Sequence, residues 1–369
     1  MSTDSNTTGQ DGGRRQAIVN IVKIVGAFLG FLIGSGFSTG QEAMQYFVSY
    51  GVKGFAAISM FLVLGIYITV TMLLVGNKYG FKNNEEIFRH YAGRVGGTLF
   101  SLYAVISLYC VYFVMLSAAG SVLHESYGLP VWAGALIMGL AVFATLYFGL
   151  REVVNVLGAL GPVLIVMIIV IALVTVLRDP GAVAEGMRIA PTLETLKISN
   201  SWWLSGVLYP ALMATGIASF MAPLGAKVRS RRQLVTAGIL GPCLFVFTLM
   251  LVALALFSGL PEIAGLGIPM LELASRSLPF IAGVFSIVIT VGIFTTAVPL
   301  LWITLVRFSE DGSRRYHQLA VVLTLLGVIC GTVMPFDRLL NVVFETIGWS
   351  GILMFVLVAV RQIRDRSWV

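Results

Sequence analysis

The chain has 369 residues, of which 58% are hydrophobic and only 11% are charged. Soluble domains carry a charge on roughly a quarter of their residues, so this composition excludes a soluble globular protein. The meaning of the net charge of +7 depends on where the basic residues lie. The three cysteines and three histidines are scattered, and their spacing predicts neither a disulfide framework nor a metal-dependent enzyme.

Runs of about 20 mostly apolar residues are long enough to cross a bilayer core as helices. Ten such runs predict an all-α polytopic membrane protein. In chain order they cover 17–50, 54–77, 97–123, 131–149, 152–177, 203–225, 233–258, 279–306, 317–334 and 337–361. The first run is too long for one straight helix. The polar, Gly-rich stretch 1–16 predicts a disordered tail.

Lys and Arg residues fall unevenly on the two sides that ten spans create. With the N-terminus inside, 18 of the 24 basic residues lie on the cytoplasmic side, as the positive-inside rule requires. We therefore expect a multi-pass protein of the plasma membrane with both termini in the cytoplasm, a connector at 178–202 outside and a second tail at 362–369 inside. The excess charge then reports orientation, and we expect no nucleic-acid partner.

The spans divide into two halves, 17–177 and 203–361, with five spans in each. An odd number of spans inverts the second half relative to the first, as in many secondary transporters. Each half has a small-residue cluster in its first span, Gly34-Ser35-Gly36 and Ala214-Thr215-Gly216, and an amphipathic connector before its third, 84–93 and 269–278. These features predict a five-plus-five inverted repeat; coincidence among ten helices is the alternative.

The small-residue cluster in the first span predicts a break between half-helices at 17–33 and 38–50. Irregular backbone at membrane depth is tolerated where it lines a cavity or is buried in protein, so a break indicates a site. The free N–H groups that begin the second half-helix suit an anion, and the carbonyls that end the first suit a cation. Close helix packing through small residues is the alternative.

The segment 33–37 resembles the first-helix motif of the amino acid, polyamine and organic cation transporter superfamily, and the segment 34–42 resembles the YkvI-like membrane protein family within it. The second resemblance extends over most of the chain. The resemblance to the superfamily implies the LeuT-type fold, with a substrate between broken first and sixth helices, enclosed by the third, eighth and tenth. In relatives that transport amino acids, Gly34, Ser35 and Gly36 would bind a carboxylate, and 214–216 would face an amino group.

Aromatic residues near these breaks are candidates for the cavity wall. They are Tyr109 and Tyr112 on the third span and Tyr209 before the sixth-helix cluster. The full set of candidate substrate residues is Gly34, Ser35, Gly36, Phe37, Tyr109, Tyr112, Tyr209, Ala214, Thr215 and Gly216.

Two acidic residues stand out deep inside predicted spans, where an ionisable side chain is costly and indicates a pathway or a partner. Glu42 follows the first break, and Glu345 shares a polar stripe with Asn341 at four-residue spacing in the last span. We expect these three residues to serve proton coupling or recognition of a cationic group. A structural hydrogen bond is the alternative for Glu345.

Thr295 and Thr296 in the eighth span are candidate ligands for a sodium ion, because hydroxyl and carbonyl oxygens suit a hard cation. Hydroxyls that bond back to their own helix are the alternative. Sodium-coupled members of the fold carry adjacent hydroxyl residues at about this place. Some proton-coupled relatives use a lysine of the fifth helix, and this chain has none between Arg151 and Arg178. The missing lysine favours sodium over protons as the coupling ion. We expect no cofactor other than this possible Na⁺.

These features together predict a secondary transporter of a small zwitterionic or cationic solute, an amino acid or an amine. We do not expect an enzyme. Alternating access coupled to Na⁺ or H⁺ would drive it. The alternative is a membrane sensor or scaffold that keeps the fold without transporting.

Overall fold

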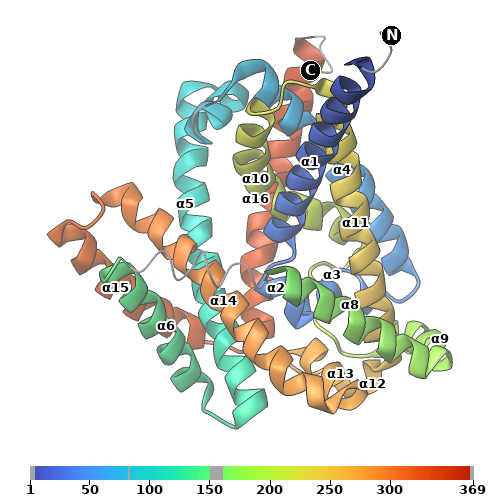
Figure 1. Ribbon diagram of the computed structural model, residues 1–369. Helices are drawn as coiled ribbons and strands as arrows, with labels where there is room; N and C mark the ends of the chain where they lie inside the picture. Colours follow the sequence, from blue (N-terminus) through green and yellow to red (C-terminus); the bar gives the residue numbers. More distant parts are fainter. Residues whose placement is uncertain (1–4, 82–83, 150–160, 366–369) are drawn as a thin grey trace.

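The computed structural model describes residues 5–81, 84–149 and 161–365 (Figure 1). Every regular element in these ranges is helical. The helices are α1 Ser5–Leu32, α2 Ser35–Thr39, α3 Gln41–Tyr46, α4 Lys53–Tyr79, α5 Asn84–Tyr127, α6 Val131–Tyr147, α8 Gly161–Arg178, α9 Pro180–Ile189, α10 Trp202–Ala226, α11 Arg231–Ser258, α12 Leu260–Ile263, α13 Pro269–Ser277, α14 Pro279–Phe308, α15 Arg314–Thr332 and α16 Phe336–Arg364, with short 3₁₀ turns η1 Val48–Tyr50 and η2 Ala190–Thr192.

Helices of spanning length occupy the predicted positions. Within the described ranges, nine are long and apolar enough to cross a membrane: α1, α4, α5, α8, α10, α11, α14, α15 and α16. The fourth predicted span corresponds to α6, an apolar helix of 17 residues. The start of the fifth predicted span, up to residue 160, lies outside the described residues.

The two ends of the chain are more helical than the sequence predicts. Helix α1 begins at Ser5, although 1–16 was expected to be disordered. Extending a formed helix costs much less than nucleating one, so the apolar span can carry its polar neighbour into the helix. At the other end, α16 continues past residue 361 to Arg364.

The predicted break in the first span is confirmed, and the segment is interrupted twice. Helix α1 ends at Leu32, α2 begins at Ser35, and Gly40 separates α2 from α3. Gly40 has a φ of 86°, a left-handed conformation that glycine adopts without steric cost. The expected half-helix 38–50 is therefore divided among the end of α2, α3 and η1.

The predicted break in the sixth span is wrong. Helix α10 runs from Trp202 to Ala226, and each residue of the Ala214–Gly216 cluster is helical. A methyl group on Gly216 would collide with the ring of Phe31, so the small residue lets α1 approach α10 closely. Pro210, inside α10, lacks an N–H and cannot donate to the carbonyl of Gly206.

Both predicted connectors are present as short amphipathic helices. In the first, Arg89 pairs with Glu85 at 2.6 Å, and a φ of 72° at Gly93 turns the chain into the rest of α5. In the second, α13, Arg276 pairs with Glu272 at 2.6 Å. The same four-residue ion pair thus recurs at equivalent places in the two halves.

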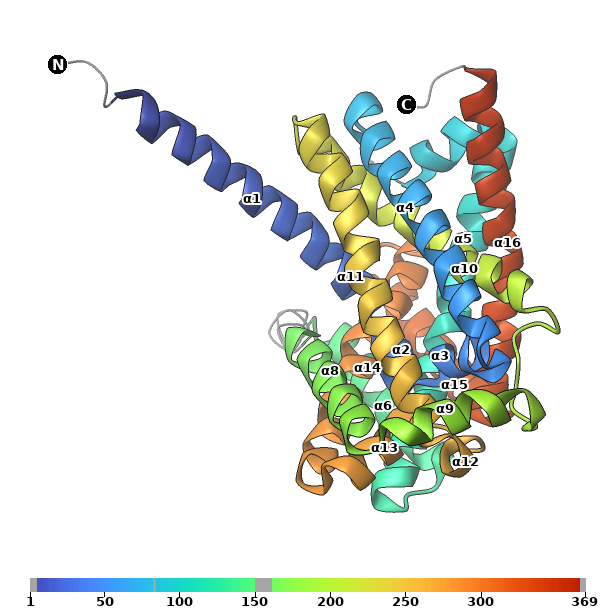
Figure 2. The same cartoon turned by 90° about the vertical axis from the view of Figure 1, so that its right-hand side faces the viewer.

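The spanning helices form two groups. In one, α4 packs against α10 and α11, and α1 packs against α11; in the other, α5, α6, α14 and α15 pack together. Helix α16 contacts both groups, through α10 and α5. Figure 1 shows the first group to the right of the second, and Figure 2 shows the N-terminal part of α1 standing away from the other helices.

Glycines set the closest helix approach in the first group. A methyl on Gly76 of α4 would collide with the carbonyl of Ala222, and one on Gly225 of α10 would collide with the carbonyl of Leu73. Backbones that meet this closely gain van der Waals contact, which is what holds helices together where lipid is as apolar as the side chains.

Candidate functional site

A central cavity of about 440 Å³ lies between the two helix groups. Helices α1, α2, α3 and α10 line one side, α5 and α14 line the other, and α16 contributes from the edge. The cavity brings together six of the residues that the sequence singled out: Gly34, Gly36, Glu42, Thr215, Gly216 and Thr296.

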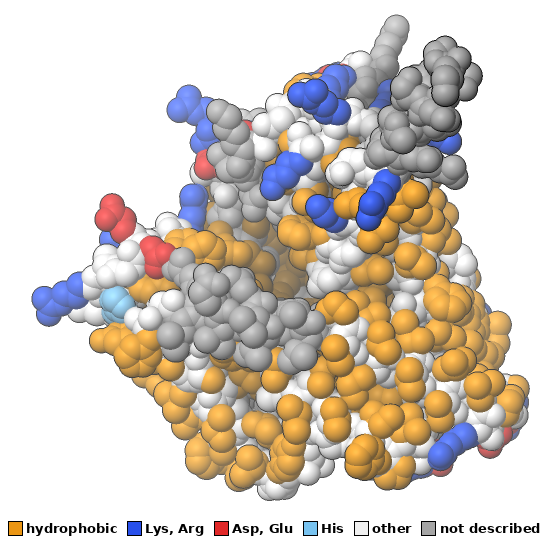
Figure 3. Space-filling view, in the orientation of Figure 1, with side chains coloured by type: hydrophobic (Ala, Val, Ile, Leu, Met, Phe, Trp, Pro, Cys, Tyr) orange, Lys and Arg blue, Asp and Glu red, His pale blue; other side chains and the backbone are white. Residues whose placement is uncertain are grey.

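The cavity extends in one direction from the broken helix. Along α10 its lining runs from Leu212 to Phe220, away from Tyr209 and toward the C-terminal end of that helix. This is the end of the molecule at which both chain termini lie (Figure 1). Figure 3 shows Lys and Arg gathered along the same upper rim, an apolar surface below them and a recess near the centre of the view.

Glu42 is the only acidic or basic side chain among the described residues that line the cavity. It lies on α3, is 4% exposed, and its Oε2 accepts a hydrogen bond from the hydroxyl of Tyr209 at 2.9 Å. Its Oε1 lies so close to Gly36 that a methyl there would collide with it. A carboxylate is therefore held against the backbone of the broken helix.

Tyr209 lies one layer behind the cavity. The sequence predicted it as part of the wall, but its side chain is fully buried and it is not among the lining residues. Its ring centre lies 4.7 Å from that of Tyr46, 5.1 Å from that of Phe47 and 5.4 Å from that of Phe61. This aromatic packing fixes the hydroxyl that orients Glu42.

The other residues predicted around the two breaks are distributed differently. Phe37 is buried, with its ring centre 5.2 Å from that of Phe245 on α11, and it is not among the lining residues. Ala214 is buried and outside the lining. The side chain of Ser35 lies outside the described residues.

Tyr109 and Tyr112 face α15 and do not line the cavity, which corrects the prediction. The Tyr109 hydroxyl donates to the carbonyl of Leu323 at 2.8 Å. The two tyrosine rings stack with centres 5.9 Å apart, and Tyr112 packs onto Gly327 of α15. They hold α5 to α15 within the second helix group.

Thr295 and Thr296 both donate to the carbonyl of Gly292, at 3.0 and 2.9 Å. This is the back-bonded arrangement that was the alternative to sodium binding. Each hydroxyl oxygen still has lone pairs, and Thr296 also lines the cavity. A sodium site here stays a prediction. The described residues contain no group of three or more His, Cys, Asp and Glu side chains that would form a metal centre.

Glu345 lies away from the cavity. It is half-buried, and its Oε1 accepts a long hydrogen bond of 3.5 Å from the indole of Trp349, which is 51% exposed. Glu345 is therefore a half-buried residue of α16 outside the cavity lining, with a structural hydrogen bond to Trp349.

Asn341 belongs to a polar layer that closes the end of the cavity beyond Glu42. Its amide donates to Gln45 Oε1 at 2.9 Å and to the carbonyl of Lys197 at 3.1 Å. Gln45 in turn donates to Gln41 Oε1 at 3.1 Å and to the carbonyl of Asp337 at 2.8 Å. These amides tie α3 to α16 and to the connector before α10, so the structure is closed on this side.

Several residues that line the cavity are not among those predicted from the sequence. Leu212, Met213, Ser219 and Phe220 share one face of α10 with Thr215 and Gly216. Spacings of three and four residues from Gly216 would have identified that face. Phe31 of α1 stacks on Phe220 with ring centres 5.6 Å apart, a contact between two halves of the chain that local spacing does not reveal.

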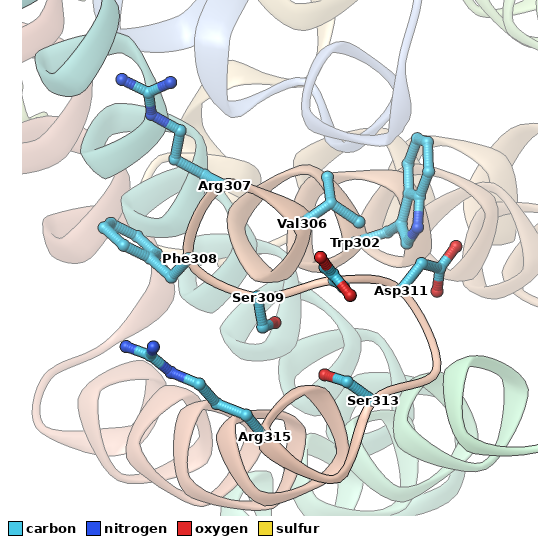
Figure 4. A pocket seen from close by; sticks show the side chains of 9 residues that line it. Trp302, Val306, Arg307, Phe308, Ser309, Asp311, Ser313 and Arg315 are labelled. Atoms are coloured by element: carbon cyan, nitrogen blue, oxygen red, sulfur yellow. The ribbon is translucent and has the colours of Figure 1, made fainter.

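A second cavity of about 700 Å³ lies at the loop between α14 and α15. In Figure 4, Arg307 and Arg315 lie on one side of it, and Trp302 and Asp311 lie on the other. Its acidic residues lie in the loop, and Arg307 and Arg315 lie at the adjoining ends of α14 and α15, at the edge of the second helix group. The cavity at the helix break is the better candidate for a solute site.

Comparison with known proteins agrees with this architecture. No family model matches the chain. The Bacillus subtilis membrane protein YkvI is 25% identical over 280 residues, which cover 74% of this chain and 77% of YkvI. YyaD of the same organism is 21% identical over 276 residues, which cover 73% of this chain and 76% of YyaD.

Solved structures share the fold. The structure of MhsT in complex with L-phenylalanine aligns with a TM-score of 0.62 and 16% identity, covering 91% of this chain and 88% of MhsT. The manganese transporter of Eremococcus coleocola aligns with a TM-score of 0.57 and 12% identity, covering 90% of this chain and 76% of that one. These neighbours are LeuT-fold transporters and not enzymes. The chain is a multi-pass membrane protein homologous to YkvI, and it has the LeuT-type fold.

Proposed function

We propose that the protein is a secondary active transporter that moves an amino acid or amine across the plasma membrane by alternating access, coupled to Na⁺ or H⁺. The observation that carries the proposal is the position of Glu42: a buried carboxylate beside a helix break, at the closed end of a central cavity. An ionisable group inside a membrane span is costly, and such groups commonly mark a substrate or ion pathway.

The arrangement of the two ends of the cavity supports alternating access. One end extends toward the chain termini, and the polar layer of Gln41, Gln45 and Asn341 closes the other. Each hydrogen bond in such a layer contributes only about 0.5–1.5 kcal/mol net. A layer of this strength can open and close within a transport cycle when the two helix groups move relative to each other.

Two positions support coupling to a cation. Glu42 can exchange a proton, because its carboxylate faces the cavity. Thr296 lines the cavity with a hydroxyl that retains acceptor capacity for sodium. Imposing a sodium gradient and a proton gradient separately on proteoliposomes distinguishes these two positions.

The first prediction tests Glu42 directly. Purified protein in liposomes should accumulate labelled amino acids or amines under one of the two gradients. Glu42→Gln keeps the size and the hydrogen bond from Tyr209 but removes the charge, and we expect uptake to fall by at least about tenfold, equivalent to about 1.4 kcal/mol.

Glu345→Gln is the matched control. It makes the same chemical change on α16 outside the cavity lining, and uptake should stay within about twofold of wild type, because the amide keeps the size of the side chain and can still accept the hydrogen bond from Trp349. Equal losses in the two variants would contradict the assignment of Glu42. Absence of uptake across a broad solute panel under both gradients would favour the sensor or scaffold alternative.

A further inference from the structure

Among the described residues that line the central cavity, only Glu42 has an acidic or basic side chain, and this limits the class of solute that the cavity can take. We infer that it takes an apolar organic cation, an amine without a carboxylate, in preference to a zwitterionic amino acid. This inference rests on the proposed function, because it assumes that the central cavity is the solute site. The proposed function covers both amino acids and amines, and this inference chooses between these two classes.

The carboxylate of Glu42 already lies where a solute carboxylate would approach the broken helix. Glu42 Oε1 lies against Gly36, at the start of α2. A solute carboxylate that approached the free backbone N–H groups there would meet Glu42 at close range. Like charges repel strongly in a site with little water. Glu42 therefore occupies the place that an amino acid would need for its own carboxylate.

The rest of the described lining has no basic side chain that could pair with a solute carboxylate. Among the described lining residues there is no Lys, Arg or His to pair with an anion. The polar side chains of the described lining other than Glu42 carry hydroxyls, from Ser107, Thr215, Ser219 and Thr296 among others. Hydroxyls suit an ammonium group or a neutral donor as well as an anion, so they do not offset the negative charge of Glu42.

The remaining wall of the central cavity is apolar and aromatic. The stacked pair Phe31 and Phe220 lies beside Met115, Met213 and Leu300 in the lining. A volume of about 440 Å³ is within the usual range for small-molecule sites. Aromatic faces also attract a nearby cation. The cavity thus matches a molecule with an ammonium group at one end and an aromatic or branched apolar body at the other.

The test uses ligand pairs that differ only in the carboxylate. Purified protein is titrated with 2-phenylethylamine and L-phenylalanine, and with tryptamine and L-tryptophan, and Kd is measured calorimetrically. L-phenylalaninamide keeps the amino acid skeleton but lacks the negative charge. We expect each amine, and the amide, to bind at least about tenfold more tightly than the matching amino acid.

Variants attribute the preference to Glu42. Glu42→Gln should weaken 2-phenylethylamine binding by at least about tenfold and leave the neutral analogue 2-phenylethanol within about twofold. Tyr209→Phe keeps the carboxylate and removes only its hydrogen bond, so it should preserve the preference for amines. The wild-type ligand pairs answer the question even if the Glu42 variant fails to fold.

The outcomes separate the two proposals. Tighter binding of L-phenylalanine than of 2-phenylethylamine would overturn the cation inference. Glu42-dependent uptake of that amino acid in liposomes would at the same time support the proposed transporter. Absence of both binding and uptake for all six compounds would count against both proposals.

Discussion

The absence of a side chain at Gly36 is what allows a carboxylate to lie on the broken helix. Glu42 Oε1 occupies the space that a methyl on Gly36 would need. The sequence identified Gly36 as part of a break and Glu42 as an unexplained charge. It could not show their contact, because that depends on the turn at Gly40, whose φ of 86° sets the direction of α3 relative to α2.

A second prediction follows at this position. Gly36→Ala should displace Glu42 and lower the affinity for solute by at least about tenfold, because the new methyl and the carboxylate oxygen cannot share the same space. Gly30→Ala is the control: a methyl there has no neighbour within 4 Å, and affinity should be unchanged. Binding that survives Gly36→Ala intact would contradict the placement of Glu42.

The sequence indicates which segments lie near the cavity but does not determine which way their aromatic side chains point. Tyr109, Tyr112 and Tyr209 all lie near the cavity level, yet none of them lines it. Tyr109 donates to α15 and Tyr209 packs among Tyr46 and the phenylalanines around it. An aromatic ring on a membrane helix turns toward whichever neighbour packs against it, and a single sequence does not reveal that neighbour.

At the scale of elements, the two small-residue clusters look alike in sequence and behave differently. The first breaks a helix, while the second, Ala214 to Gly216, lies inside α10 and accommodates Phe31. The first contains Gly34 and Gly36 within three residues, and glycine has low helix propensity. The second has one glycine. Phe31, which packs against the small residues of this second cluster, comes from α1 and is far away in the sequence.

The amide layer between α3 and α16 provides a third prediction. Asn341→Ala removes hydrogen bonds to Gln45 and to the carbonyl of Lys197 and leaves these partners unsatisfied. Each buried unsatisfied group costs about 1–3 kcal/mol, so the variant should unfold at a lower temperature than wild type in detergent.

The control for this layer lies on the same helix. The hydroxyl of Thr346 bonds only to Val342 of α16 and its residue is exposed, so Thr346→Ala should leave the unfolding temperature nearly unchanged. A wild-type melting temperature for Asn341→Ala would show that the layer does not hold the closed side together.

At the scale of the whole molecule, much of the fold follows from the sequence. Apolar length and the placement of Lys and Arg predict the spans, and matching connectors predict the repeat. The cavity does not follow, because its wall combines α1, α5, α10, α14 and α16. No pattern within one segment specifies how helices from two halves face one another.

Orientation in the membrane is a further prediction at this scale. Both termini lie at the same end of the molecule (Figure 1), and the basic residues predict that this end is cytoplasmic. Alkaline phosphatase, which needs disulfides and so an oxidising compartment, should be inactive when fused after residue 369 and active when fused after residue 197. Activity at the C-terminus would reverse the orientation.

In the proposed transport cycle, the single carboxylate of Glu42 would also limit the stoichiometry. One carboxylate balances one positive charge, and the described lining of the cavity holds no second acidic group. A protonated amine and a free proton are then mutually exclusive occupants of Glu42. A cycle in which each displaces the other would carry them in opposite directions, whereas co-transport would need a separate cation site, such as the one predicted at Thr295 and Thr296.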